Sequence, residues 1–289
     1  MNAMVNVTES ATTNVSTNAI KLIGFKAYEA LVRAGGDAQA IPGFAHTPYL
    51  HVNGEIIWLG SDLAELHPRA VIMERPFLLK GKTQHFDTSD SRPWHPHRGV
   101  LEAAHLPRVM ETCRALCKPL QTLAPAKGFG SMLLNQVPEY PLNLASRNIE
   151  NIACGFRKGS PEHVYQAALP LIGFGPGVTP PGDDFIGAAL FGRALLAKSD
   201  AAAWDDIAQR LLGKAKDRSH IISSTLMADL IAGHSFAPLH QLAEALMYAQ
   251  AQAEVIAAIQ KLIRIGHSSG WDMLSGFIVG LTGRVSLCD

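Results

Sequence analysis

The segment GFGPGVTPPGDDF, residues 173–185, places two acidic side chains, Asp183 and Asp184, at the end of an unusual loop. The segment holds four glycines and three prolines, and it runs directly into apolar residues typical of a helix. A glycine-rich loop loses much conformational entropy when it becomes ordered, so a bound ligand would explain this composition. Because the unpaired N–H groups at a helix N-terminus attract negative charge, the segment predicts one half of a small anion-binding site.

A second segment, GHSSGWDML at residues 266–274, resembles the first. Aligned from Gly182 and Gly270, the two stretches share Gly, Asp and Gly at their first, third and eleventh places. Each is typical of an apolar helix with an acid in its first turn, Asp184 in one and Asp272 in the other. A glycine inside a helix costs about 0.5–1 kcal/mol relative to alanine, so we expect close helix packing at these positions. The sequence predicts a pseudo-symmetric pair of helices whose N-termini face one pocket.

The start of the first helix is expected to lack a side-chain cap. Pro181 suits the first helical position, and Pro180 before it has no capping oxygen. The N–H groups of Gly182 and Asp183 are then available to a ligand. The alternative is that Thr179 or Asp183 folds back and caps the helix itself.

The start of the second helix carries a Ser-x-x-Asp pattern, Ser269 to Asp272, which predicts a capping box. His267 and Ser268 are then left to face solvent or substrate. Taken singly, each residue has a structural explanation, because Asp184 and Asp272 would complement the helix dipoles and the serines would be caps. Only their combination with the loop favours a ligand site.

A third polar cluster starts at Arg218 and Ser219 and continues to Ser223. Arg218 can pair with a carboxylate or phosphate in bidentate fashion; the alternative is an exposed cap with a salt-bridging arginine. The catalytic candidates are Asp184, Asp272 and His267, and the substrate-binding candidates are Gly175, Gly177, Thr179, Gly182, Asp183, Arg218, Ser219, Ser223, Ser268 and Ser269. No metal ligands are predicted, because the pair His95-Pro-His97 lacks nearby cysteines or acids.

Composition excludes several classes of protein. The 289 residues are 47% hydrophobic and 17% charged, and 25 basic residues balance 25 acidic ones. Without a basic stripe, nucleic-acid binding is not expected. No apolar run approaches the roughly 20 residues of a membrane span. The four cysteines are expected to be reduced core thiols, which together with the absence of a signal peptide favours the cytoplasm.

The expected fold class is α+β, with a small N-terminal β-sheet or barrel domain before a larger all-α domain that carries the repeated loop–helix unit. Residues 1–19 are expected to be a flexible tail, 20–95 the β-rich domain and 96–289 the mainly helical domain. Asn53-Gly54 inside YLHVNGEIIWL predicts a hairpin, and residues 70–79 predict a strand with Pro76 at an edge or bulge. Apolar spacing predicts helices within residues 98–123, 161–172, 185–198, 202–215, 221–232, 239–248 and 251–265.

The segments GFGPGVTPPGDDF, Arg218 to Ser223 and GHSSGWDML closely resemble the motifs of a bacterial family labelled as carboxylases of unknown function. That family includes a subunit of oxamate carbamoyltransferase from anaerobic allantoin degradation. The resemblance covers most of the second half of the chain and, more loosely, the first half. One difference lies at Pro181, where the family motif leads us to expect serine in Thr-Pro-Ser-Gly. A hydroxyl is therefore missing, and any role of that hydroxyl does not transfer.

The resemblance implies a transferase subunit that acts with other subunits, one of them similar to acyl-CoA synthetases, to move a carbamoyl group between phosphate and oxamate. These small anions suit helix N-termini with an arginine nearby. Asp184 or Asp272 would orient the attacking amide, and His267 would move its proton. Because two carboxylates repel a phosphate, either Mg²⁺ joins them or they point away as caps, and the cofactor stays open. The alternatives are a non-catalytic anion-binding or structural subunit, and a carboxylase.

Overall fold

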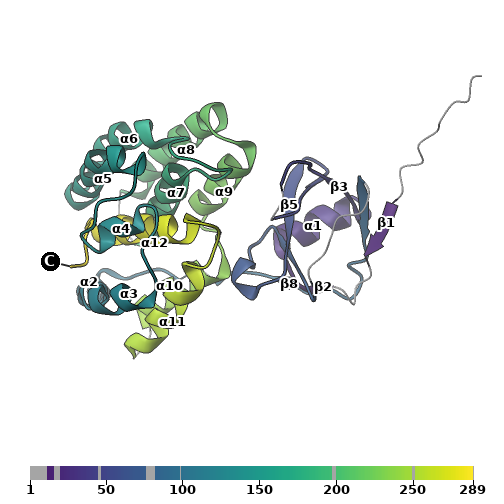
Figure 1. Cartoon of the computed structure of the whole chain (residues 1–289), viewed down its shortest axis with the longest axis horizontal. Helices are drawn as coiled ribbons and strands as arrows, with labels where there is room; N and C mark the ends of the chain where they lie inside the picture. The colour runs from purple at the N-terminus through teal and green to yellow at the C-terminus, as the bar shows by residue number, and fades with distance from the viewer. Residues whose placement is uncertain are drawn as a thin grey trace, which may run out of the picture. The chain divides into compact units, whose positions relative to one another are not determined.

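The computed structural model describes residues 12–15, 20–44, 47–75, 82–97, 99–196, 200–248 and 251–288. The chain divides into two compact units, Met1–Pro96 and His97–Asp289. Strands dominate the first unit and helices the second, so the α+β class is confirmed (Figure 1). That the units are separate domains stays a prediction. Within the expected tail, Thr12–Val15 forms a strand, while residues 1–11 and 16–19 lie outside the described residues.

The described strands of the first unit form one mixed sheet in the order β1-β7-β3-β4-β5-β6-β2-β8. Asn53 and Gly54 form the predicted hairpin turn, both with positive φ, and β4 pairs antiparallel with β5. Pro76 lies outside the described residues. The strands are β1 (Thr12–Val15), β2 (Ile20–Gly24), β3 (Asp37–Ala40), β4 (Tyr49–Val52), β5 (Glu55–Gly60), β6 (Ala70–Met73), β7 (Thr83–Phe86) and β8 (Pro93–Trp94).

One helix of the first unit was not predicted. Helix α1, Phe25–Arg33, follows β2 directly and buries Ala27, Ala30 and Leu31 against the sheet. Ala30 and Leu31 follow Ala27 by three and four positions, which is the pattern of an amphipathic helix packed on one face. The helix was missed because β2 ends directly where α1 begins, and the residues around it are typical of strands.

The second unit is built from α-helices joined by short loops and 3₁₀ turns, as predicted. The predicted helix 98–123 is broken between Arg114 and Cys117, and α5 was not predicted. The helices are α2 (Leu106–Arg114), α3 (Cys117–Leu123), α4 (Gly130–Leu133), α5 (Ser146–Lys158), α6 (Pro161–Ala168), α7 (Pro181–Ala194), α8 (Ala201–Arg218), α9 (Ile221–Ile231), α10 (Ala237–Tyr248), α11 (Gln252–Leu262) and α12 (Ser269–Thr282).

Helices α7 and α12 lie side by side in the middle of this unit (Figure 1). All residues of α7 from Pro181 to Arg193 are buried, and so are residues 270–282 of α12. A helix that is apolar on all sides belongs inside a core. Here the two helices are packed between two hydrophobic clusters, to both of which they contribute.

The glycines of the pair let the two backbones touch. A Cβ atom on Gly276 would collide with the carbonyl oxygen of Phe185, and one on Gly280 with that of Ala189. Both contacts step forward by four residues on each helix, so the helices run parallel and their N-termini lie at the same end. A Cβ atom on Gly192 would meet the carbonyl oxygen of Phe277 in turn.

The aligned segments are offset by 88 positions, so Gly192 corresponds to Gly280 and Ala189 corresponds to Phe277. The contacts Gly192–Phe277 and Gly280–Ala189 are therefore equivalent under a pseudo-two-fold rotation. The starts of the two helices also resemble each other, because each has a glycine packed against a carbonyl oxygen that precedes it in the chain. A Cβ atom on Gly182 would collide with the carbonyl oxygen of Leu171, and one on Gly270 with that of Leu262. The weak sequence repeat therefore corresponds to a pseudo-two-fold helix pair.

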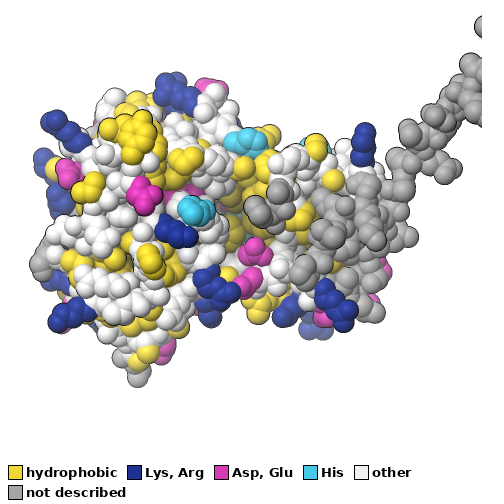
Figure 2. Space-filling model, viewed as in Figure 1, with side chains coloured by type: hydrophobic (Ala, Val, Ile, Leu, Met, Phe, Trp, Pro, Cys, Tyr) yellow, Lys and Arg dark blue, Asp and Glu magenta, His cyan; other side chains and the backbone are white. Residues whose placement is uncertain are grey.

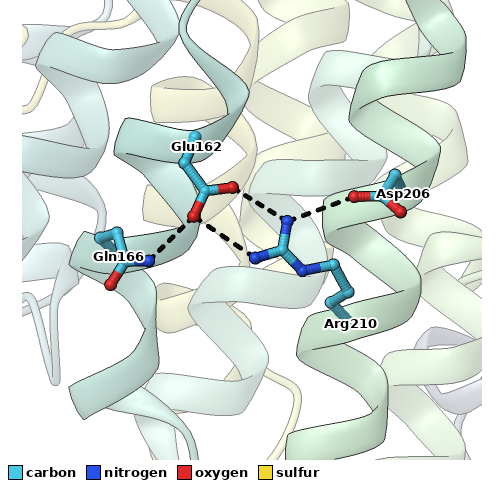
Figure 3. A network of polar contacts seen from close by, with 4 residues as sticks. All are labelled: Glu162, Gln166, Asp206 and Arg210. Atoms are coloured by element: carbon cyan, nitrogen blue, oxygen red, sulfur yellow. Dashed lines mark hydrogen bonds and ion pairs between the residues drawn. The ribbon is translucent and has the colours of Figure 1, made fainter.

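Exposed ionic contacts tie peripheral helices together. Arg210 on α8 bonds Glu162 on α6 at 2.9 Å and Asp206 at 3.2 Å (Figure 3). Its guanidinium also lies over the ring of Tyr165. The hydrogen bonds from Arg210 and Gln166 lower the pKa of Glu162. On the face in Figure 2, basic and acidic side chains are interspersed, which agrees with the zero formal net charge.

Cys117 and Cys288 form a disulfide with a Cα–Cα distance of 5.2 Å. The prediction that all four cysteines are reduced thiols is therefore wrong for this pair, whose members lie 171 residues apart in sequence. Cys113 and Cys154 are free, and burial raises the pKa of the Cys113 thiol to about 12. Among the described residues, no helix is both long and apolar enough to span a bilayer.

Candidate functional site

The loop before α7 curls back over the start of that helix. Pro181 is the first helical residue, as predicted, and Pro180 makes no side-chain capping bond. Gly175 has a φ of 106°, and a Cβ atom there would lie 2.7 Å from the ring of Pro181. Only glycine fits this turn comfortably, since an L-residue at that φ is strained and has no room for its side chain.

The main-chain N–H groups at the start of α7 are paired within the protein. Gly182 donates to the carbonyl oxygen of Phe174 at 3.0 Å, and Asp183 donates to that of Pro180 at 2.9 Å. The prediction that these two N–H groups are available to a ligand is therefore wrong. The turn of the glycine-rich loop brings the Phe174 carbonyl back to the helix start, so backbone takes the place of a side-chain cap.

The start of α12 is capped by backbone as well. Gly270 donates to the carbonyl oxygen of Ile265 at 3.0 Å, and the first bond within the helix runs from Asp272 to Ser268 at 2.9 Å. Ser268 is the N-cap and makes no side-chain capping bond. The predicted capping box between Ser269 and Asp272 is therefore wrong, because Ser269 is already the first helical residue.

The hydroxyls of Thr179 and Ser269 join the two helix starts. Their oxygens lie 3.1 Å apart, although the residues are separated by 90 positions in sequence. The sequence prediction that the turns near residues 180 and 270 are neighbours is thus confirmed. Together with Ser268, these residues are half-exposed.

Asp183 bonds Gly173, Ser219 and Ser223, and we call these four residues the latch. Oδ1 of Asp183 accepts the N–H of Gly173 at 2.8 Å, and its Oδ2 accepts the hydroxyls of Ser219 and of Ser223, the latter at 2.7 Å. The side chain is buried. Three of the predicted binding residues therefore bind one another, and they hold the glycine-rich loop against the junction of α8 and α9. The side chain of Arg218, beside this latch, is exposed.

Asp184 and Asp272 form a buried acid pair at the base of the two turns. Asp184 is 5% exposed and Asp272 is fully buried. Oδ1 of Asp272 accepts the N–H of Phe129 at 2.7 Å. The Oδ2 atom of each acid is buried without a hydrogen-bond partner among the described residues. An unpartnered buried oxygen is costly, so each Oδ2 is a candidate contact for a proton, a water or a ligand.

Burial changes the ionisation of both acids. Loss of hydration raises the pKa of Asp272 to about 7, partly opposed by the bonds from Phe129 and Ser268. Burial and the nearby charge of Asp272 raise the pKa of Asp184 well above its ordinary value, opposed by the hydroxyls of Ser269 and Thr179. Because the charge of one acid disfavours ionisation of the other, the pair holds a proton near neutral pH.

The structure thus divides the predicted residues into two sets. Those in contact with the acid pair or belonging to it are Thr179, Asp184, Ser268, Ser269 and Asp272, and those in the latch are Asp183, Ser219 and Ser223. Gly177, Arg218 and His267 are exposed and take part in neither set of contacts.

Sequence reasoning missed the loop that receives Asp272. Gly128 has a φ of 54°, and a Cβ atom on it would collide with the carboxylate of Asp272. A Cβ atom on Gly130 would likewise lie only 2.5 Å from the ring of Trp271. The signal in the sequence is the Gly-x-Gly pattern of residues 128–130, between a proline-containing turn and a buried run.

Among the described residues, no group of three or more His, Cys, Asp or Glu side chains is arranged to hold a metal ion. The two unpartnered carboxylate oxygens are of the type that Mg²⁺ accepts, but they supply only two protein ligands. Neither acid lines the cavity beside Trp204, the one beside Met247 or the one beside Arg284. The half-exposed hydroxyls of Thr179, Ser268 and Ser269 are therefore the polar groups that connect the pair with the surface.

No curated protein and no solved structure matches this chain. Residues 171–281 contain the latch and the acid pair, as well as α7 to α11 and nearly all of α12. These residues match the family model described as oxamate carbamoyltransferase subunit AllH, which confirms over this part of the chain the resemblance that its motifs carry.

Proposed function

We propose that this protein is a subunit of a carbamoyl-transferring enzyme of the oxamate carbamoyltransferase type, and that Asp184 and Asp272 are its acid–base pair. The family match over residues 171–281 supports the first part. The observation that carries the second is the pair of buried, unpartnered Oδ2 atoms, with a pKa near 7 for Asp272. A carboxyl with such a pKa changes its protonation state under working conditions.

The proposed reaction joins the amide nitrogen of oxamate to the carbamoyl carbon and breaks the bond from that carbon to the phosphate oxygen. The nitrogen must lose a proton, and ionised Asp272 would accept it. Asp184, kept neutral by burial, would donate a hydrogen bond to the carbamoyl oxygen as negative charge develops there. Phosphate leaves with the electron pair of the broken bond.

The substrate anion would bind over the hydroxyls of Thr179, Ser268 and Ser269, at the N-termini of α7 and α12. Hydroxyls can donate to anionic oxygens, and both helix dipoles favour negative charge at this end. The backbone N–H groups of Gly182 and Asp183 do not bind the anion in this proposal, because they are paired within the protein. His267, exposed next to Ser268, would exchange the proton with solvent.

Other subunits, including one similar to acyl-CoA synthetases, would complete the enzyme, and the cytoplasm is its proposed location. The cysteines no longer support that location, since two of them form a disulfide and disulfides are rare in the cytosol. Both acids are buried in this chain by itself. Such burial fits a subunit whose site is completed by other subunits.

A second candidate is a non-catalytic subunit. The deep burial of Asp272 and its bond to Phe129 favour it, because a carboxylate can also serve to pin a loop. The two candidates differ in what the acids do during turnover.

The test uses the reconstituted complex and measures phosphate release from carbamoyl phosphate in the presence of oxamate. Asp184→Asn and Asp272→Asn retain the size and one acceptor of each side chain, and exposed Asp217→Asn is the matched control. We expect kcat to fall by about 10²–10⁴-fold in the two site variants and to stay unchanged in the control, as for loss of a general acid or base. If both site variants retain the wild-type kcat at saturating substrate, the subunit is non-catalytic.

A further inference from the structure

A cavity of about 240 Å³ lies in the helical unit, between the last turn of α7, the end of α9 and helix α10. Its walls are mostly apolar and include Phe191, Leu195, Ile231, Ala243 and Met247. Protein interiors are close-packed, and hollows larger than a water molecule are few. An apolar cavity of about 150 Å³ in another protein is known to bind benzene or xenon. This one therefore has room for a substituted six-membered ring.

The inner wall of the cavity is aromatic and uncharged. His240 is 5% exposed, and its ring meets that of Phe191 at a centroid distance of 5.3 Å and an angle of 89°. Nε2 of His240 accepts the N–H of Ser235 at 3.1 Å. A ring nitrogen that accepts carries no proton, so this imidazole is neutral with its proton on Nδ1.

Among the described residues at the rim of the cavity, His97 and Glu244 form an ionic contact. Nδ1 of His97 lies 2.8 Å from Oε1 of Glu244, and both side chains are partly exposed. The carboxylate of Glu244 is on the wall, so an anion entering here would lose hydration beside a like charge. The described lining of the cavity thus disfavours the small anions expected at the acid pair.

We propose that this cavity is a binding site for a small uncharged molecule built on a single apolar ring. The ring would pack against Phe191 and His240, and Met247 would adapt to its shape, as flexible methionines do. The site is distinct from the acid pair. Asp184 lies in the first turn of α7, whereas Phe191 lies in its last turn and Leu195 is its C-cap, about 10–16 Å along the axis.

The test is a thermal unfolding series of the full chain with toluene, and with benzoate as its charged counterpart. Ligand at ten times its Kd is expected to raise Tm by about 2–3 °C for a chain of this size. We expect toluene to produce this rise and benzoate to produce none. If toluene leaves Tm unchanged near its solubility limit, or if benzoate is equally effective, the proposal is wrong.

A variant and a crystal locate the site. Ala243→Leu fills the cavity and is expected to abolish the rise with toluene, whereas the same change at exposed Ala253 on α11 is expected to preserve it. Crystals of the unchanged protein under xenon pressure are expected to show xenon between Phe191 and Met247, a result that needs no variant to fold. Xenon absent from this cavity, or an equal response of both variants, would overturn the assignment.

Discussion

The carbonyl oxygen of Ala189 on α7 occupies the place that a Cβ atom on Gly280 of α12 would need. Through this contact and its pseudo-symmetric counterpart, the two helices run parallel with their backbones touching. Parallel packing places Asp184 and Asp272 at the same end, where the charge of Asp272 raises the pKa of Asp184. The glycines therefore position the acid pair, although none of them can take part in its chemistry.

The first prediction concerns this helix contact. Gly280→Ala must push α12 away from Ala189 or distort both backbones, and we expect it to lower the free energy of unfolding by about 1–3 kcal/mol. Gly213→Ala is the matched control, since Gly213 is a helix-interior glycine of α8 with open space where its Cβ would go. It is expected to stabilise by about 0.5–1 kcal/mol. Urea unfolding measures both, and equal effects at the two positions would contradict the packing argument.

The second prediction separates Asp183 from its neighbour. Asp183→Ala removes the acceptor for the N–H of Gly173 and for the hydroxyls of Ser219 and Ser223. Leaving such donors unpaired is expected to cost about 3 kcal/mol of unfolding free energy. Exposed Asp217→Ala is expected to change it by less than about 0.5 kcal/mol. Chemical denaturation of the two variants side by side is the measurement, and a stable Asp183→Ala protein would show that the latch is unimportant.

The sequence predicted the helix pair and the neighbourhood of the two turns because those features rest on local patterns. Glycine, acid and apolar residues repeat in the same order, and repeated local chemistry produced repeated structure. Pro181 was placed correctly for the same reason, since the constraint on proline lies in its own ring.

The predictions that were wrong depended on contacts that no preference of a single residue specifies. The N–H of Gly182 is paired because Phe174 reaches back through turns set by glycine φ angles, and no single-residue preference specifies that path. Phe129 was missed because nothing near residue 129 indicates that Asp272 will accept its N–H, 143 positions away. The joining of Cys117 to Cys288 likewise depends on tertiary packing.

The third prediction concerns that disulfide. Breaking it with dithiothreitol is expected to lower the free energy of unfolding by about 2–5 kcal/mol, because a long closed loop is released in the unfolded chain. Cys154→Ser should respond to reductant as the unchanged protein does, whereas Cys117→Ser should not respond. Thermal unfolding with and without reductant measures this. Alkylation followed by mass spectrometry provides the check, and four reactive thiols in the unreduced, denatured protein would contradict the bond.

The last prediction uses the pKa of Asp272, raised by burial from 3.8 to about 7. Between these pH values the folded protein keeps a proton that the unfolded chain has released, so stability falls as pH rises through this window. For Asp272 alone the loss between pH 5 and pH 7 is about 2–3 kcal/mol. Asp272→Asn cannot titrate and still offers Oδ1 to Phe129, so its stability should gain on the unchanged protein by that amount over the same range. Urea unfolding at pH 5, 6, 7 and 8 measures the difference, with Asp217→Asn as control. Parallel curves for Asp272→Asn and the unchanged protein would mean that Asp272 does not change its protonation state between pH 5 and pH 8, and it could then not act as the base of the proposed pair.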